Sequence, residues 1–211
     1  MRVDTIELLR CPATHESAPL VTVADTRDGE RLTSGTLGCP VCGADYAMRH
    51  GIVYLTSATT NVALLQSASA ITSSNGMRTA ALLGLTEPGL RVVLCGAHAV
   101  DADEIEHATG AHCIAVNSRA HMHESSGADQ LVMLASDSLP LANASVHGLA
   151  LDITHAALLA DARRVVRVGG RVVAPVSTRV PRGLRELARD DREWVAQVEA
   201  APSAPMQLTR R

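Results

Sequence analysis

Beyond about residue 60, strand-like and helix-like segments alternate along the chain, and this alternation constrains the fold more than any other feature. Short apolar runs such as RVVLCG (91–96) are typical of buried strands, whereas longer segments such as VDADEIEHAT (100–109) are typical of helices. The alternation predicts an α/β fold in which helices cover a parallel sheet. The predicted helices span 61–85, 100–109, 155–170 and 182–200, and the predicted strands span 91–96, 111–117, 131–136, 146–152 and 171–177.

The first 55 residues carry a different pattern. Short strand-like runs are separated by turn residues such as DTRDGE (25–30), and cysteines occur in knuckle-like pairs, which predicts a small β-rich module. A polar stretch of small residues, TSATTN (56–61), marks the join with the α/β part. The predicted boundaries are 1–57 for the β-rich domain, 58–78 for a linker helix, 79–200 for the α/β domain and 201–211 for a C-terminal tail.

The composition of the chain indicates the cellular compartment in which it is expected to lie. The chain has 211 residues, of which 46% are hydrophobic, so it can bury a substantial core. No apolar run approaches the roughly 20 residues that span a bilayer, and the first twenty residues lack the apolar centre of a signal peptide. We therefore expect a cytoplasmic protein. In a reducing compartment, five irregularly spaced cysteines favour metal ligands or buried thiols over a disulfide framework.

Arginines are concentrated towards the C-terminal end, although the net charge is −3. A locally basic region can contact an acidic protein, lipid headgroups or nucleic acid. The chain has only three aromatic residues of the kind that stack on bases, Tyr46, Tyr54 and Trp194, so binding of single-stranded nucleic acid by stacking is poorly supported. Spacings of three and four would place several arginines on one face of the predicted last helix, and interleaved acidic residues equally suit a solvated face. The arginines are Arg163, Arg164, Arg167, Arg171, Arg179, Arg182, Arg185, Arg189, Arg192, Arg210 and Arg211.

The segment Cys39-Pro40-Val41-Cys42 is followed by Tyr46 and then by Gly51-Ile52-Val53. Together with the earlier LLRCP, this order resembles the Trm-like zinc ribbon, the small subunit that activates tRNA, rRNA and release-factor methyltransferases. The resemblance covers roughly the first 55 residues. It implies a zinc site, because a C-x-x-C turn presents two thiolates that need a second pair of ligands opposite them.

The second pair departs from the family pattern. Where the family often has C-P-x-C, this chain has Cys11-Pro12-Ala13-Thr14-His15, so a threonine replaces the second thiolate and an imidazole follows it. One interpretation is a zinc site built from Cys11, His15, Cys39 and Cys42, which would be structural because four protein ligands leave no open position for catalysis. The other is that metal binding has been lost and that the apolar core alone holds the module.

Two landmarks stand out in the α/β part: Leu139-Pro140, and the run from Arg164 to Val173 that contains Gly169-Gly170. In this order and spacing they resemble the late part of a class I S-adenosylmethionine (SAM)-dependent methyltransferase of the small-molecule type 11 kind. The resemblance spans about residues 78–177 and implies a Rossmann-like parallel sheet. The glycine pair is expected at a helix-to-strand turn that needs positive φ.

The glycine turn after the first strand differs from that family. The family's first strand ends in an acidic residue and a G-x-G-x-G turn. Here Leu94 replaces the acidic residue and Gly96 keeps the first glycine, while His98 and Val100 replace the other two. Glycines let the backbone approach the cofactor closely, so two side chains are expected to fill space that the ligand would need.

The other cofactor contacts are also altered. Asn117 stands where the family has an acidic residue on the ribose, and a neutral amide accepts through one oxygen only. Ala135 replaces the residue that contacts adenine, Asp137 lies two positions out of register, and His147 replaces a further aspartate. Gly96, Asn117 and Asp137 therefore remain as vestigial cofactor-binding residues, and no catalytic residue is predicted. The family's final antiparallel strand pair is expected to be missing or replaced.

The remaining histidines and cysteines have simpler interpretations. The run His121-Met122-His123-Glu124 is interpreted as a solvated loop. Cys95 and His98 are interpreted as a packed thiol and an imidazole that plugs the turn, because no third partner for a metal or a reaction is identifiable. Three further histidines are treated as structural or exposed: His107, His112 and His155.

Taken with the resemblance, these patterns predict a zinc ribbon fused to a degenerate methyltransferase fold that no longer methylates. The expected role is a structural or interaction subunit of a larger bacterial complex. We expect docking through the Arg-rich C-terminal helix and tail, for instance on the cytoplasmic face of a photosynthetic or respiratory membrane complex. Structural zinc is the expected cofactor, and neither SAM nor nucleic acid is expected to bind. Two alternatives stay open: a divergent methyltransferase with a built-in activator, marked by an open pocket beside Gly96, and a zinc-ribbon RNA-binding module.

Overall fold

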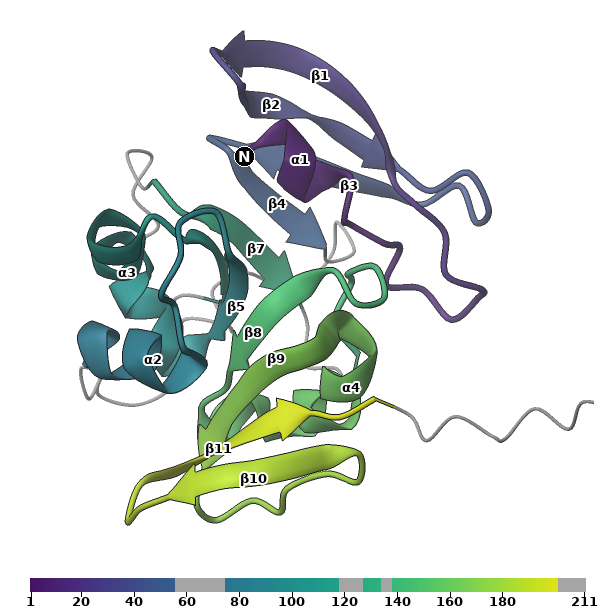
Figure 1. The fold of residues 1–211 in the computed structure, drawn as a ribbon. Helices are drawn as coiled ribbons and strands as arrows, with labels where there is room; N and C mark the ends of the chain where they lie inside the picture. The colour runs from purple at the N-terminus through teal and green to yellow at the C-terminus, as the bar shows by residue number, and fades with distance from the viewer. Residues whose placement is uncertain (56–74, 118–126, 134–137, 201–211) are drawn as a thin grey trace, which may run out of the picture.

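The computed structural model describes residues 1–55, 75–117, 127–133 and 138–200. Within these ranges, eleven strands form one mixed sheet in the order β1-β2-β3-β4-β7-β6-β5-β8-β9-β11-β10 (Figure 1). The strands are β1 (Val21–Asp28), β2 (Arg31–Gly38), β3 (Asp45–Arg49), β4 (Ile52–Leu55), β5 (Arg91–Cys95), β6 (His112–Val116), β7 (Asp129–Met133), β8 (Val146–Ala150), β9 (Val166–Pro175), β10 (Leu184–Arg189) and β11 (Glu193–Val198).

Five parallel strands form the centre of the sheet, in the order β7-β6-β5-β8-β9. Counted along the chain from β5, this is the order 3-2-1-4-5 of the Rossmann fold. Val92 and Leu94 of β5 join one hydrophobic cluster, whereas Val93 and Cys95 join the other. A strand buried on both faces reads as a continuous apolar run, as β5 does. The predicted α/β fold with a Rossmann-like parallel sheet is confirmed.

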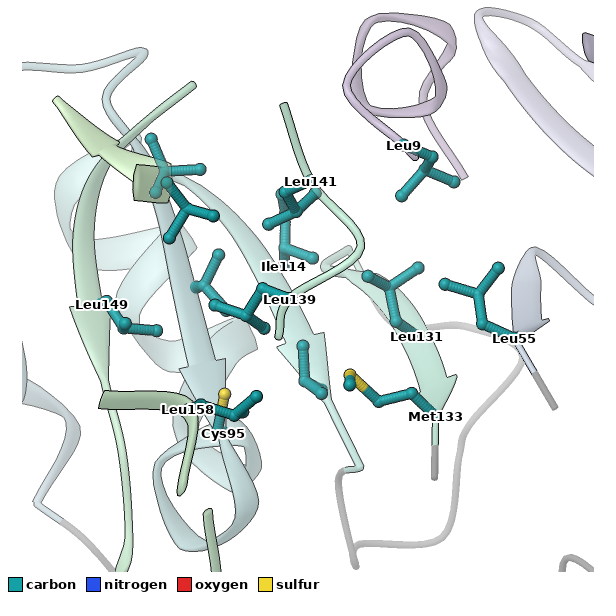
Figure 2. Close-up of a cluster of buried hydrophobic side chains, with 14 of the residues drawn as sticks. Leu9, Leu55, Cys95, Ile114, Leu131, Met133, Leu139, Leu141, Leu149 and Leu158 are labelled. Carbon is teal, nitrogen blue, oxygen red and sulfur yellow. The ribbon is translucent and has the colours of Figure 1, made fainter. Parts of the chain in front are cut away.

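Each face of this central sheet has its own cover. On one face lie α2 (Gly76–Leu83) and α3 (Ala102–Thr109), the second preceded by the 3₁₀ turn η2 (Gly96–Asp101) (Figure 1). On the other face the loop bearing Leu139 and Leu141 packs its side chains against the sheet (Figure 2). The helix predicted over 100–109 is confirmed as α3.

Two predicted features fall on parts of the chain that lie outside the described residues. The predicted linker helix (58–78), like the helix predicted over 61–85, overlaps the stretch 56–74, and its described end is α2. Asn75 begins that helix by accepting a hydrogen bond from the Arg78 N–H, and Gly84 ends it at φ 70°. The predicted tail (201–211) also lies outside the described residues.

The N-terminal module, residues 1–55, continues the same sheet. β1 to β4 pair as an antiparallel series, with the short helix α1 (Val3–Ile6) preceding them. β4 then pairs in parallel with β7, so that residue 52 lies opposite residue 130. The module is β-rich, as predicted, and it adds four strands to one side of the Rossmann-like sheet.

Asp129, the first residue of β7, anchors this module. Its carboxylate is 1% exposed and accepts a hydrogen bond from the Arg2 N–H at 2.9 Å and another from the Thr5 hydroxyl. The Arg31 guanidinium pairs with it at 3.1 Å. A buried carboxylate needs such partners, because an isolated charge in the core is costly. One side chain thus joins the N-terminal end of the chain to the central sheet.

The prediction of a helix over 182–200 is wrong, because this segment forms the hairpin of β10 and β11. β11 lies between β9 and β10 and buries Trp194, Val195 and Val198, which are residue types that favour strands. The turn closes on Asp190, whose carboxylate accepts the N–H groups of residues 192 and 193. An antiparallel strand pair therefore ends the sheet, where the family's final pair was expected to be missing or replaced.

The helix predicted over 155–170 is also wrong in its second half. The chain forms the 3₁₀ segment η3 (Ile153–Ala160) and the short helix α4 (Ala162–Val165), and β9 begins at residue 166. Gly169 has φ 83°, as expected for this glycine pair, although it lies within the strand. A Cβ on Gly170 would lie 2.6 Å from the His147 carbonyl oxygen, so close strand packing explains that glycine.

Among the described residues, we find no helix with the length and apolar character needed to span a membrane.

Candidate functional site

Four side chains converge at one end of the N-terminal module to form a thiol–imidazole cluster: Cys11, His15, Cys39 and Cys42. One ligand atom from each lies within 4.8 Å of all the others. Cys11 Sγ lies 3.7 Å from Cys42 Sγ, and Cys39 Sγ lies 3.4 Å from His15 Nε2. The structure therefore brings together the four residues that sequence reasoning selected, and it places Cys42 at the surface with the other two thiols buried.

The cluster's donor set fits a structural zinc ion. Ligands at about 2.3 Å from the centre of a tetrahedron lie about 3.8 Å apart, and the two distances above are close to this value. Such a site needs thiolates. Burial opposes ionisation of Cys39, but hydrogen bonds from the backbone N–H groups of Cys42 and Val41 lower its pKa to about 6. Burial is also the main reason why the pKa of Cys11 is raised, despite its contact with the Tyr46 hydroxyl at 3.4 Å.

A cavity of about 670 Å³, which we call the junction cavity, lies beside the cluster. Cys11 and His15 line it from the N-terminal module, and Leu139, Pro140 and Arg164 line it from the α/β part. The Arg164 guanidinium bonds to Asp161 and to the carbonyl oxygens of Leu139 and Leu141. Arg164, the first residue of the run 164–173 that the sequence analysis singled out, therefore holds the loop 139–141 in place.

The glycine turn after β5 is the second candidate site. Gly96 has φ 61°, and a Cβ placed on it would lie 2.0 Å from Asp152 Oδ2. The same oxygen accepts a hydrogen bond from the Ala97 N–H at 2.9 Å. Burial would raise the pKa of Asp152, but hydrogen bonds from His155, Thr154 and the Ala97 N–H hold that pKa far below its usual range. An ionised side chain from the end of β8 thus fills the turn that a cofactor would approach.

Asp152 continues into a chain of polar contacts that reaches β6. Because an ionised carboxylate only accepts, His155 Nδ1 donates to Asp152 Oδ1 at 2.7 Å. His155 Nε2 then accepts from the Asn117 amide at 3.3 Å, and Asn117 Oδ1 accepts from the Met133 N–H at 2.9 Å. We call Asp152, His155 and Asn117 the groove network, since it runs from the glycine turn to the position where the resemblance implies ribose binding.

His98 lies on the other side of the turn. It is buried, with Nδ1 at 3.1 Å from the Thr79 hydroxyl and Nε2 at 3.1 Å from Glu193 Oε1. The hydrogen bond with His98 is the main cause of the lowered pKa of Glu193, and Arg78 adds to it. The interpretation of His98 as a plugging imidazole agrees with this burial, and the partners that hold it come from α2 and β11.

A second cavity, the carboxyl-end cavity, opens at the ends of β5, β8 and β9 and has a volume of about 330 Å³. In open α/β sheets, ligands bind in the crevice beyond the carboxyl ends of the strands. Ala97, the residue after Gly96, lines this cavity, so the structure has a hollow beside the glycine turn. It is lined by Asn75, Arg78, Thr79, Ala97, His98, Leu151, Asp152, Ile153, Pro175, Arg192 and Glu193.

The remaining sequence candidates are distributed as follows. Gly96 and Asn117 lie at the two ends of the groove network, whereas Ala135 and Asp137 lie outside the described residues, as does the run 121–124. His147 accepts a hydrogen bond from the Arg91 N–H at 3.0 Å and so has a structural role. Asp152 and Glu193 were missed. The position of Asp152 directly after the predicted strand could have signalled it, but nothing local could have signalled Glu193.

Comparisons with known proteins bear on the fold alone. No protein-family model matches the sequence, and no curated protein matches it. Among solved structures, the chain is similar to the antibiotic-resistance methyltransferase Kmr, with 16% identity, a TM-score of 0.38, and coverage of 64% of this chain and 97% of that chain. It is also similar to a putative sarcosine dimethylglycine methyltransferase from Galdieria sulphuraria, with 12% identity, a TM-score of 0.38 and coverage of 46% and 43%.

A further similar structure is a putative methyltransferase from Bacillus halodurans C-125, with 18% identity, a TM-score of 0.33, and coverage of 47% of this chain and 50% of that chain. The chain thus spans half or less of the length of the two putative methyltransferases.

Proposed function

We propose that this chain is a non-catalytic protein with a methyltransferase-like fold, and that it serves as a structural or interaction subunit with a structural zinc ion in its N-terminal module. The observation that carries the proposal is the groove network. The Asp152 carboxylate accepts a hydrogen bond from the Ala97 N–H, and the His155 imidazole accepts one from the Asn117 amide. A cofactor entering this path would have to break these bonds and desolvate an ionised carboxylate, which is costly.

The test is isothermal titration of the purified chain with SAM and with S-adenosylhomocysteine. We expect no binding heat for the wild type. The Asp152→Ala variant removes the carboxylate that fills the glycine turn and ends the groove network, so it separates two causes. Binding by that variant alone would identify the network as the obstacle, whereas silence from both proteins would mean that the missing acidic contacts suffice. Micromolar binding by the wild type would contradict the proposal.

The zinc part of the proposal has its own measurement. Elemental analysis of the purified chain is expected to give one zinc ion per molecule, and Cys39→Ser is expected to lose most of it because one of four ligands is gone. The matched control is Cys113→Ser, which changes a buried cysteine outside the cluster. Wild-type protein without zinc would support the competing interpretation, in which the apolar core alone holds the module.

The interaction part of the proposal concerns the C-terminal hairpin, since the Arg-rich helix does not exist. β10 is an edge strand with exposed side chains that include Arg185, Leu187 and Arg189. An open edge strand can pair with another chain. We propose that this edge meets a larger assembly, for instance a membrane complex. Purification of the native protein at the size of a free monomer would count against this role.

One observation favours a second function, that of a divergent SAM-dependent methyltransferase. The carboxyl-end cavity lies where ligands bind in open α/β sheets, and it is bounded by Asp152, His98 and Glu193. This function requires that SAM binds and that its methyl group is transferred. The titration above decides the first point, and incorporation of a labelled methyl group into small-molecule acceptors decides the second.

A further inference from the structure

The thiol–imidazole cluster combines buried and exposed sulfur atoms. Cys42 is exposed, whereas Cys11 is buried and lies with its sulfur 3.7 Å from that of Cys42. Thiols that respond to peroxides are typically accessible and lie next to a second cysteine that resolves the first oxidation product. The pair formed by Cys42 and Cys11 meets both conditions. Because Cys11 also lines the junction cavity, its side of the cluster borders open space.

We propose that Cys42 and Cys11 are a peroxide-responsive pair that forms a disulfide between the two loops of the cluster. In the first step the Cys42 thiolate attacks one oxygen of hydrogen peroxide, the O–O bond breaks, and the hydroxide that leaves takes up a proton to become water. In the second step the sulfur of the Cys11 thiol attacks the sulfur of the Cys42 sulfenic acid, the S–O bond breaks, and the hydroxide that leaves takes up the Cys11 thiol proton to become a second water. The two thiols lose two electrons and the peroxide gains them.

We take Cys11 as the resolving thiol because its sulfur lies 3.7 Å from that of Cys42 and because it belongs to a separate loop. A disulfide needs its sulfur atoms about 2.05 Å apart, so Cys11 and Cys42 have to approach by under about 2 Å from their present separation. Cys39 is buried and has its sulfur 3.4 Å from His15 Nε2. The expected bond therefore links the loop after Cys11 to the knuckle at 39–42, and not the two cysteines of the knuckle.

Oxidation and metal binding compete for the same sulfur atoms. A disulfide between Cys11 and Cys42 removes two of the four ligands that a structural zinc ion would need, and a disulfide sulfur is no longer a thiolate. Zinc release on oxidation is the one consequence that rests on the proposed zinc site. Formation of the disulfide needs only the cysteines themselves, and it is independent of whether the fold binds SAM.

The experiment treats the purified full-length chain with hydrogen peroxide, alkylates the remaining thiols under denaturing conditions and digests the product with trypsin. Cleavage after arginine puts Cys11 in the peptide 11–27 and both knuckle cysteines in the peptide 32–49. We expect these two peptides to be cross-linked after peroxide treatment and separate before it. Cys95 and Cys113 are buried and should remain free thiols in the same samples, which provides an internal control.

Variants and fragmentation identify the sulfur atoms. The cross-link should persist in Cys39→Ser and disappear in Cys42→Ser and in Cys11→Ser. If a variant does not fold, fragmentation of the wild-type cross-linked peptide assigns the same bond. A disulfide inside peptide 32–49, a cross-link that survives Cys42→Ser, overoxidation of Cys42 without a cross-link, or no reaction at all would each overturn the proposal.

Zinc measured in the same samples separates the two proposals. We expect the zinc content to fall in proportion to the cross-linked fraction. A cross-link in a chain that never contained zinc would refute the zinc site and leave the peroxide-responsive pair supported.

Discussion

At position 96 the chain has no side chain, and the carboxylate of Asp152 takes the space where one would be. The need for glycine is therefore double, because the backbone has φ 61° and because Asp152 lies close. Sequence reasoning selected Gly96 as the remnant of a cofactor turn but could not see Asp152. Asp152 bonds to Ala97, which follows β5, and to His155, which follows β8. These two strands are distant in sequence and adjacent in the sheet, so no short stretch of sequence shows the contact.

Replacement of Gly96 by alanine is expected to destabilise the protein by about 3 kcal/mol, from left-handed strain and from the clash with Asp152. Denaturant unfolding measures this loss. Gly89→Ala is the matched control, since Gly89 has φ 78° and nothing within 4 Å of a Cβ; we expect it to cost about 1 kcal/mol. The double variant Gly96→Ala with Asp152→Ala should recover part of the loss, and full additivity would contradict the clash.

His147 makes the stability of the folded chain depend on pH. Burial is the largest cause that lowers its pKa below 6.5, with Arg167 adding to it, and its Nδ1 must stay unprotonated to accept the Arg91 N–H. The unfolded chain therefore binds a proton before the folded chain does, so this contribution to stability is present above pH 6.5 and is lost as the pH falls.

The corresponding prediction is a fall in the free energy of unfolding below pH 6.5 that is shallower in His147→Asn, because an amide oxygen can accept the same hydrogen bond without titrating. Denaturant unfolding at a series of pH values measures the slope. Parallel slopes for the two proteins would exclude His147 as the source.

At the scale of elements, the sequence predicted the central strands well and the C-terminal hairpin badly. β5, β6 and β8 are apolar runs bounded by turn residues, so local pattern and buried position agree. The segment 182–200 has leucines and arginines at helical spacings, yet it pairs with β9 because Trp194 and its neighbours are buried against that strand. Long-range pairing overrode local propensity there, and no short window of sequence contains that information.

Trp194 is the side chain that fixes the hairpin. It is fully buried, and its indole N–H donates to the hydroxyl of Thr178 at 2.9 Å. Trp194→Ala is expected to cost about 4 kcal/mol in the free energy of unfolding. Circular dichroism during denaturation measures this cost, and Leu187→Ala, which changes a partly exposed residue of β10, should cost under about 1 kcal/mol. Equal costs would mean that β11 is not a core strand.

At the scale of the whole molecule, the N-terminal module and the central sheet are linked by the pairing of β4 with β7 and by Asp129. Sequence analysis predicted the two parts but not their union into one sheet. The pairing joins segments on opposite sides of the chain's middle, and it depends on the register between residue 52 and residue 130. The convergence of the thiol–imidazole cluster was predictable, because cysteine spacing is a local signal.

Asp129→Ala is expected to destabilise the whole chain by about 3 kcal/mol, because it leaves the Arg2 backbone N–H and the buried Thr5 hydroxyl without their acceptor and removes the ion pair with Arg31. Amide hydrogen exchange should show faster exchange in β4 and β7 than in β8. Asp129→Asn keeps the shape and one acceptor oxygen and should lie between the wild type and the alanine variant. Unchanged exchange in β4 would show that Asp129 is not needed to hold the module.

The parallel pairing of β4 with β7 also sets an order of events during synthesis. β4 leaves the ribosome long before β7, so its outer edge has no partner while the chain grows, and unpaired edges of this kind promote association between chains. The N-terminal module can form its antiparallel hairpins early, because these contacts are local. Its attachment through β4 must wait until β7 has been made, so the module stays separate from the sheet while residues 56–128 are synthesised.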